Sequence, residues 1–233
     1  MNFETQLEQF KLKDYQLNQL RTYAQFLNEK NKVMNLTAID DLEGVTEKHF
    51  VDSLLIGEFL TDSKTFCDVG SGAGFPGVVL AIAYPDIEFT LVEPTGKRCQ
   101  FLNDLTDLLK LSNVNVVNAR AEDYVKEMRE QFDVVSARAV ANLVILSELC
   151  LPLVKVGGQF IAMKGQRALE ELEQAQFAIK TLGGEVFNSQ KSMLRDGSLR
   201  YNIIVKKVKS TPQKYPRAFG KIKKNPLNKK KGG

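Results

Sequence analysis

The stretch Asp68-Val69-Gly70-Ser71-Gly72-Ala73-Gly74-Phe75-Pro76-Gly77 decides the fold of this chain. It follows an apolar run with strand character, 65–69, and it precedes residues typical of a helix, 76–84. Glycine lets a backbone turn tightly and approach a ligand closely, and proline suits the first turn of a helix. A strand, a glycine turn and a helix start, in this order, predict the ligand-binding turn of a doubly wound α/β fold.

The glycine pattern alone is a weak signal. Residues 72–77 satisfy the G-x-G-x-x-G pattern of dinucleotide sites, yet structural glycines in any strand-to-helix turn give a similar match. A second predicted strand, 88–93, ends in Glu93, whose carboxylate is placed to accept hydrogen bonds from ribose hydroxyls. An acid, Asp68, precedes the glycines, and the pattern G-x-G-x-x-G counted from Gly70 has Phe75 at its third glycine position. Both features favour S-adenosylmethionine over a nicotinamide cofactor.

Strands and helices alternate through the middle of the chain, which predicts a mostly parallel sheet covered on both faces. Near the end, 184–190 and 201–208 are expected to form an antiparallel hairpin. Such a hairpin is typical of a doubly wound, seven-stranded methyltransferase (Rossmann-like) sheet rather than of a six-stranded dehydrogenase. The other strands are expected at 65–69, 88–93, 114–118, 132–137 and 159–164, and helices at 76–84, 96–110, 121–130, 141–155 and 166–182.

The chain is expected to have three parts. Leu17, Leu20, Ala24 and Leu27 recur at helical spacing after a predicted N-cap at Asp14. A second helix is expected over 46–60. The expected parts are an N-terminal helical extension packed on the core (1–60), an S-adenosylmethionine-dependent methyltransferase domain (61–208) and a basic C-terminal arm (209–233).

Composition points to a cytoplasmic protein with one good core. The 233 residues are 43% hydrophobic, without an apolar run of about 18 residues or a secretory signal. Cys67, Cys99 and Cys150 lie far apart and match no metal-binding spacing, so reduced, buried thiols are expected and no metal. The lone histidine, His49, argues against histidine-based chemistry, and we expect it to make structural hydrogen bonds.

The net charge of +4 hides an asymmetry. Residues 206–233 hold eleven lysines and arginines and no acid, leaving 21 basic against 28 acidic side chains in residues 1–205. Tyr215 and Phe219 among the cations could stack on bases, so we expect an RNA-binding arm that is mobile until RNA orders it. A solubilising, disordered end is the alternative. The residues expected to bind RNA are Lys214, Tyr215, Arg217, Lys221, Lys223 and Lys224.

Ligands of open α/β sheets bind outside the carboxyl ends of the strands. After the third strand, residues 118–123 are expected to contact an adenine. The alternative is an N-cap followed by acidic residues in the first turn of a helix, which need no ligand. After the fourth strand stands Arg138, where amine methyltransferases carry Asn or Asp, two prolines and an aromatic residue. Arg138 could bind the cofactor's carboxylate or a substrate phosphate, the alternative being a structural ion pair. Lys164, after the fifth strand, is expected to flank the same opening and, with Arg138, is a candidate for substrate positioning.

Several segments together resemble one bacterial family, over nearly the whole chain. It is the glucose-inhibited division protein B family of methyltransferases, which make 7-methylguanosine in 16S ribosomal RNA. The resemblance rests on 31–38 (NKVMNLTA), 49–54 (HFVDSL), 68–77 (DVGSGAGFPG), 135–143 (VSARAVANL), 163–165 (MKG) and 211–217 (TPQKYPR).

The resemblance implies a set of cofactor contacts that overlaps the set expected from the residues. The chain departs from the family pattern at two positions. At Glu93 the family is expected to have an aspartate followed by a small polar residue, and at Ala218 lysine is frequent. Glutamate can still accept both ribose hydroxyls. Together the expected S-adenosylmethionine contacts are Gly70, Ser71, Gly72, Gly74, Phe75, Glu93, Pro94, Thr95, Ala121, Glu122 and Arg138.

The implied target explains why no catalytic base stands out. Nitrogen 7 of guanine carries a lone pair and no proton, so it can attack a sulfonium methyl group directly. The implied partner is 16S ribosomal RNA or the small ribosomal subunit. Three other interpretations remain: a methyltransferase with a non-RNA substrate, an RNA-binding ribosome-assembly factor with a vestigial cofactor pocket, and a dehydrogenase.

Overall fold

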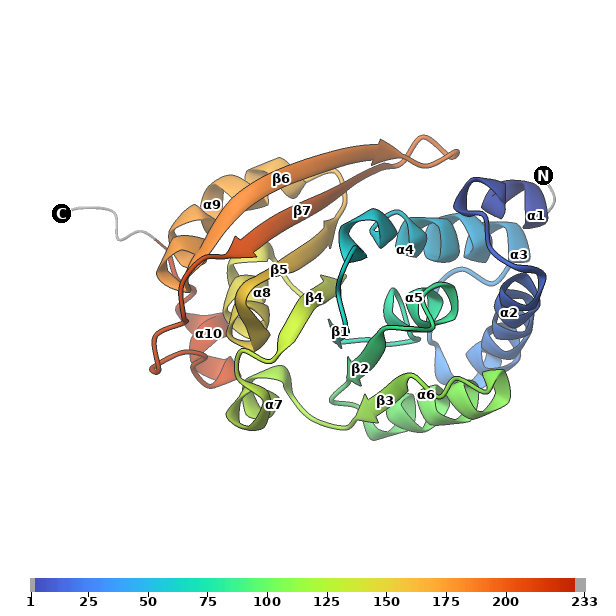
Figure 1. Ribbon diagram of the computed structural model, residues 1–233, viewed down its shortest axis with the longest axis horizontal. Helices are drawn as coiled ribbons and strands as arrows, with labels where there is room; N and C mark the ends of the chain where they lie inside the picture. Colours follow the sequence, from blue (N-terminus) through green and yellow to red (C-terminus); the bar gives the residue numbers. More distant parts are fainter. Residues whose placement is uncertain (1–2, 229–233) are drawn as a thin grey trace.

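The computed structural model describes residues 3–228, and its centre is a seven-stranded sheet of order β3-β2-β1-β4-β5-β7-β6 (Figure 1). Five neighbouring strands run parallel, and β7 is antiparallel to both β5 and β6. This confirms the predicted fold class. The strands are β1 (Thr65–Val69), β2 (Glu88–Val92), β3 (Val114–Val117), β4 (Phe132–Arg138), β5 (Val154–Lys164), β6 (Gly184–Met193) and β7 (Leu199–Lys207).

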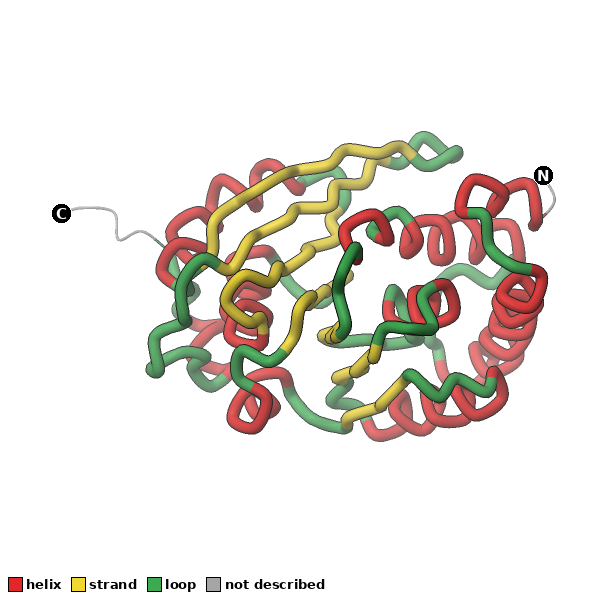
Figure 2. The backbone as a smooth tube through the Cα atoms, viewed as in Figure 1, coloured by secondary structure: helices red, strands yellow, loops and turns green. Residues whose placement is uncertain are grey.

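The expected strands are all present, with differences at their ends. β5 begins at Val154 instead of at residue 159, and its pairing with β4 shifts register between Phe132 and Val134. The hairpin is longer than expected because both strands continue toward a short turn at 194–198. Figure 2 shows this hairpin extending well beyond the other strands.

Helices cover both faces of the sheet (Figure 1). On one face α2 packs against α5 and α6, and α4 packs against α5, whereas on the other face α8 contacts α7, α9 and α10. These helices are α2 (Asp14–Met34), α4 (Asp52–Leu54), α5 (Gly77–Ala83), α6 (Gly96–Leu109), α7 (Ala121–Met128), α8 (Leu143–Cys150), α9 (Ala168–Thr181) and α10 (Phe219–Lys224).

The N-terminal region is less regular than expected. The predicted N-cap, Asp14, is instead the first residue of α2, and Lys13 occupies the N-cap position. The N–H of Lys13 donates a hydrogen bond to the side-chain oxygen of Gln16. The single helix expected over 46–60 is divided into a π-helix, α4 and a short 3₁₀-helix. The elements here are α1 (Phe3–Leu7), η1 (Glu8–Phe10), α3 (Leu42–Val45), the π-helix η2 (Thr46–Val51) and η3 (Gly57–Leu60).

One apolar core joins the N-terminal helices to the sheet domain. Phe3, Tyr23 and Phe50 pack in the same cluster as Phe75 and Leu102. Tyr23 also donates a hydrogen bond of 2.5 Å to the carbonyl of Ala73, in the glycine turn. The N-terminal helices therefore support the loop that the sequence singles out.

The expectation of a mobile C-terminal arm is wrong for residues 209–228. Tyr215 is buried, and Ile222 of α10 is fully buried in the core beside α8. Arg217 binds the fully buried carboxylate of Glu148 through Nε and Nη2, at 2.8 and 2.7 Å. The sequence suggested mobility because lysines and prolines dominate this segment, whereas its few apolar residues and one arginine hold it in place. Residues 229–233 lie outside the described part.

Cys67, Cys99 and Cys150 are buried free thiols, as the sequence analysis expected. Between residues 3 and 228, no helix combines the length and apolar character needed to cross a membrane.

Candidate functional site at the carboxyl edge of the sheet

Two adjoining cavities lie at the carboxyl ends of the strands. The first has a volume of about 550 Å³ and the second of about 570 Å³. His49, Arg138, Ala139 and Val140 line both. Ala139 has a φ of 58°, a left-handed conformation that is uncommon outside glycine and that occurs disproportionately at functional sites.

The first cavity gathers nearly all of the predicted cofactor contacts. Gly74 is the exception: a side chain there would meet the Tyr23 hydroxyl at 2.7 Å, so this glycine allows packing beneath the loop. The predicted residues that line the first cavity are Gly70, Ser71, Gly72, Phe75, Glu93, Pro94, Thr95, Ala121, Glu122 and Arg138.

The glycine turn is held by its own backbone and by Asp68. The N–H of Gly70 donates to the carbonyl of Val92 at 2.8 Å, and the N–H of Gly77 donates to Asp68 Oδ2 at 3.0 Å. Gly72 has a φ of +59°, and a Cβ there would meet only the Gly70 carbonyl within 4 Å. The backbone at Gly72 is therefore open to close approach by a ligand.

Glu93 is fixed in the first cavity by two backbone amides. Its Oε2 accepts the N–H of Gly72 at 3.0 Å, and its Oε1 accepts the N–H of Thr95 at 2.9 Å. The side chain is nearly buried. A carboxylate oxygen has room for a second donor, so both oxygens can still bind hydroxyl groups of a ligand.

The start of α7 offers further hydrogen-bond donors to the first cavity. Ala121 and Glu122 line this cavity, and no side chain caps the helix before them. The first amides of a helix have no partner within it. An acceptor on a ligand can therefore bind here, as the sequence analysis expected for an adenine.

Phe75, His49 and Arg138 form a layered group between the cavities. The rings of His49 and Phe75 stack with centroids 4.4 Å apart, and Tyr23 stacks on Phe75 at 5.3 Å. The Cζ of Arg138 lies 5.0 Å from the centre of the Phe75 ring, a cation–π contact. Aromatic packing thus fixes the position of this charged group.

Arg138 is tied into an ion-pair network. Its Nη1 donates to Asp52 Oδ2 at 3.0 Å and to the carbonyl of Lys48 at 3.1 Å. Arg200, from β7, binds the other oxygen of Asp52 through Nε at 3.2 Å. Three distant segments therefore meet at the nearly buried Asp52, and the charge of Arg138 is offset within the protein.

His49 is neutral, and both of its ring nitrogens have polar partners. Burial and the charge of Arg138 lower its pKa to about 3. Nδ1 of His49 lies 3.0 Å from the carbonyl oxygen of Lys48 and 3.2 Å from Nη2 of Arg138. On the other side of the ring, Nε2 lies 2.8 Å from Thr37 Oγ1. His49 therefore makes the structural hydrogen bonds expected of it, and it also lines both cavities.

Lys164 lines the second cavity and not the first. Its Nζ donates to the carbonyl of Ala141 at 2.6 Å and pairs with Glu171 Oε2 at 2.8 Å. Only 8% of the Lys164 side chain is exposed. This buried cation is therefore neutralised by Glu171 of α9.

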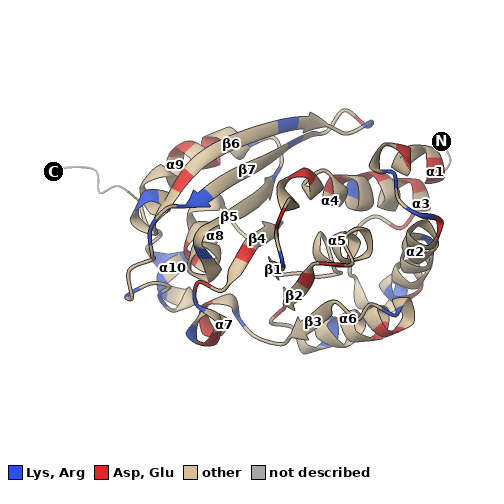
Figure 3. Ribbon diagram, viewed as in Figure 1, with Lys and Arg blue, Asp and Glu red and all other residues tan. Residues whose placement is uncertain are grey.

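The residues expected to bind RNA divide into two groups. The side chains of Lys214, Lys221, Lys223 and Lys224 are exposed, and α10 carries a basic surface (Figure 3). Tyr215 and Arg217, in contrast, are occupied in packing and in the ion pair with Glu148. The structure gives these two residues a role in holding the segment that carries the lysines.

Several residues that line the first cavity were not predicted from the sequence. Thr37 and His49 belong to segments that carried the family resemblance, and that was the available signal. Phe219 was interpreted as a base-stacking residue, yet it lines the cavity wall beside Leu149. The residues not predicted include Leu36, Thr37, His49, Arg98, Val140, Leu149 and Phe219.

Comparison with known proteins identifies the family. The GidB model, described as rRNA small subunit methyltransferase G, matches residues 16–199. This chain belongs to that family. The predicted family is thereby confirmed, and the matched residues include the glycine turn, His49 and Arg138.

Relatives of this chain match over almost their full length. A protein of Staphylococcus carnosus named ribosomal RNA small subunit methyltransferase G is 48% identical over 222 residues, covering 93% of this chain and 92% of the relative. A protein of the same name from Lactobacillus delbrueckii subsp. bulgaricus is 47% identical over 225 residues, covering 94% of each.

Solved structures confirm the fold. M. jannaschii TYW2 in complex with AdoMet superposes with a TM-score of 0.57 at 16% identity, covering 73% of this chain and 79% of that one. Precorrin-6y C5,15-methyltransferase from Geobacter metallireducens gives a TM-score of 0.51 at 18% identity, covering 67% and 87%. At these identities the likeness concerns the fold alone.

Proposed function

We propose that this chain transfers a methyl group from S-adenosylmethionine to ring nitrogen 7 of a guanosine in 16S ribosomal RNA. Membership of a family described as rRNA small subunit methyltransferase G supports the substrate class. The observation that carries the proposal is the meeting of two cavities at Arg138. One cavity suits the methyl donor, and the other adjoins it at the point where the acceptor must enter.

The residues of the first cavity fit S-adenosylmethionine. Glu93 is held by backbone amides and keeps lone pairs for the two ribose hydroxyls. The open backbone at Gly72 allows the methionine part to lie close to the turn. The uncapped start of α7 at Ala121 supplies donors for the adenine edge. When bound, S-adenosylmethionine supplies a methyl group on a cationic sulfur.

The side chains at the boundary suit an acceptor that needs no general base. Nitrogen 7 of guanine carries no proton, so Arg138 and His49 need only hold the reacting groups in line. Such positioning can lower a barrier by about 7–11 kcal/mol. The methylated purine becomes cationic, which an unpaired cation would oppose. Asp52 and Glu171 offset the charges of Arg138 and Lys164 at 3.0 and 2.8 Å.

The RNA partner belongs to the same proposal. The exposed lysines Lys214, Lys221, Lys223 and Lys224 can bind phosphates of 16S RNA or of the small ribosomal subunit. Phe219 of the same segment lines the first cavity, so the basic surface lies beside the reaction site. A cytoplasmic location, where ribosomal RNA is found, follows from this substrate.

The test is methylation of ribosomal RNA that lacks the modification. Purified protein, labelled S-adenosylmethionine and either small subunits or their extracted RNA are incubated, and the RNA is digested to nucleosides. Mass spectrometry should identify 7-methylguanosine, and nuclease mapping should place it at one position in 16S RNA. Large-subunit RNA serves as the control and should remain unlabelled. Label on another atom or base, or on no RNA, would overturn the proposal.

A further inference from the structure

The second cavity carries a further inference. It lies between the carboxyl ends of β4 and β5, and it is lined by Asn142, Lys164 and Glu171 in addition to the residues it shares with the first. We propose that this cavity receives the target guanine and that Glu171 accepts hydrogen bonds from its N1–H and 2-amino groups. The inference rests on the proposed function and names the residue that recognises the base.

Of the two acids that line this cavity, Asp52 is already fully used. Its Oδ1 binds Arg200 and its Oδ2 binds Arg138, while only 5% of its side chain is exposed. Moving Asp52 toward a ligand would break both ion pairs. Asp52 therefore holds the wall of the cavity together.

Glu171 combines a fixed position with a free acceptor. Its Oε2 accepts the N–H of Leu143 at 2.8 Å and pairs with Lys164 at 2.8 Å. Its Oε1 has no hydrogen-bond partner among residues 3–228, and 24% of the side chain is exposed. The carboxylate is thus oriented by one oxygen and open to a ligand through the other.

The hydrogen-bonding pattern of guanine matches these groups. Its Watson–Crick edge presents two adjacent donors, N1–H and the 2-amino group, and one acceptor, O6. Glu171 supplies the acceptor. Asn142 uses Oδ1 to cap α8, accepting the N–H of Ile145 at 3.1 Å, which leaves its amide N–H groups as donors for O6. Adenine has an acceptor at N1 and would face a carboxylate unfavourably.

The arrangement also places the reacting nitrogen. Nitrogen 7 lies on the five-membered ring, away from the 2-amino group. Glu171 lines only the second cavity, whereas Arg138 and Ala139 line both. A base whose Watson–Crick edge is bound to Glu171 therefore turns its five-membered ring toward the wall formed by Arg138 and Ala139. That wall borders the first cavity.

The first experiment replaces Glu171 with glutamine. Because the amide oxygen must remain with Leu143 and Lys164, the amide N–H₂ would face the donors of guanine. Hydrogen bonds to charged groups contribute about 1.5–3 kcal/mol, which corresponds to roughly 10–100-fold in kcat/KM on small subunits. Glu170→Gln is the matched control, since Glu170 pairs with Arg167 on the surface. S-adenosylmethionine affinity should be unchanged in both variants, and normal kcat/KM in Glu171→Gln would overturn the proposal.

The second experiment measures binding without methyl transfer. The mapped target is replaced in the RNA by 7-deazaguanosine, which lacks the acceptor nitrogen, or by 7-deazainosine, which also lacks the 2-amino group. The wild-type protein should bind the first RNA at least tenfold more tightly, and Glu171→Gln should bind the two alike. This comparison also tests the unsubstituted protein, so it stands if the variant fails to fold. Equal binding of both RNAs by wild type rejects the role of Glu171.

The outcomes separate this inference from the proposed function. If wild type forms 7-methylguanosine and neither the variant nor the missing 2-amino group has an effect, only the role of Glu171 fails. If wild type forms no 7-methylguanosine, the proposed function itself fails.

Discussion

The two cavities are built differently. The first is formed largely by one continuous segment, the turn at 70–75, and by residues directly after the neighbouring strands. The second depends on side chains from η2, α4, β4, β5, α9 and β7, joined by the ion pairs of Asp52 and Glu171. A site made from backbone amides is encoded locally. A site made from ion pairs exists only once distant segments have folded together.

Arg138 lines both cavities, so its replacement should have the largest effect. Arg138→Ala removes the contacts to Asp52, to the carbonyl of Lys48 and to His49, which displaces the shared wall. Misplacement of reacting groups by about 1 Å costs on the order of 100-fold in rate, and at least this loss in kcat is expected. The fold should persist because Arg200 still pairs with Asp52.

Two further variants sharpen that measurement. Arg138→Lys keeps the charge but loses the planar fork, so it should not restore turnover. Arg167→Ala removes an exposed arginine that pairs with Glu170 and should leave turnover unchanged. Wild-type kcat in Arg138→Ala, measured on small subunits, would show that the shared wall is not needed.

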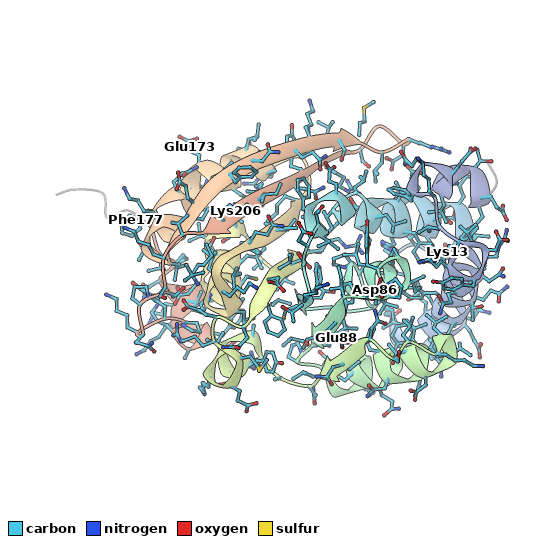
Figure 4. The ribbon with its side chains drawn as sticks, in the orientation of Figure 1. Lys13, Asp86, Glu88, Glu173, Phe177 and Lys206 are labelled. Carbon is cyan, nitrogen blue, oxygen red and sulfur yellow. The ribbon has the colours of Figure 1, made fainter. Side chains whose placement is uncertain are left out.

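Glu93→Ala should affect only the first cavity. Losing the carboxylate removes the acceptor for the ribose hydroxyls and leaves the amides of Gly72 and Thr95 without a partner. We expect S-adenosylmethionine to bind about 10–100-fold more weakly by calorimetry, with RNA binding unchanged. The control is Glu88→Ala, at the opposite end of β2 (Figure 4). If Glu93→Ala weakens RNA binding equally, the two cavities are not independent.

The same contrast explains what the sequence could predict. Glu93 was identifiable because an acid directly after a predicted strand lies at the ligand edge of any such sheet. Glu171 was not, because its role depends on α9 packing beside the end of β5. Arg217 was assigned to RNA because a basic segment is usually exposed to solvent. Its partner, Glu148, belongs to α8, and the sequence does not show that the two residues meet. Gly74 matched the ligand-binding motif, yet its backbone faces Tyr23.

His49→Gln tests the boundary through pH. The folded-state pKa of His49 is lowered to about 3 from 6.5, so the native protein keeps the ring neutral while the unfolded chain takes up a proton. The resulting stability is present above pH 6.5 and is lost as the pH falls toward 3. At pH 5 the loss should be about 2 kcal/mol. Urea unfolding at pH 7 and pH 5 should therefore differ less in His49→Gln than in wild type.

Asp68 does not confuse this measurement. Burial raises its pKa to about 6, so its own contribution to stability falls as the pH rises from about 3.8 to 6. Asp68 is present in both proteins, and its effect cancels in the comparison. An equal pH dependence in both proteins would mean that His49 is protonated in the fold.

The basic surface lies outside both cavities, so its effect should be the smallest and the most dependent on salt. Replacing Lys221, Lys223 and Lys224 with glutamine leaves Ile222, Tyr215 and the Arg217–Glu148 pair in place, unlike deletion of the segment. Each lost phosphate contact should flatten the plot of log affinity against log salt by about 0.7, giving a total near 2. A matched triple replacement of the exposed lysines Lys11, Lys32 and Lys110 should leave the slope unchanged. S-adenosylmethionine affinity should be equal in all three proteins, and a slope that does not respond to the α10 lysines would place the RNA elsewhere on the molecule.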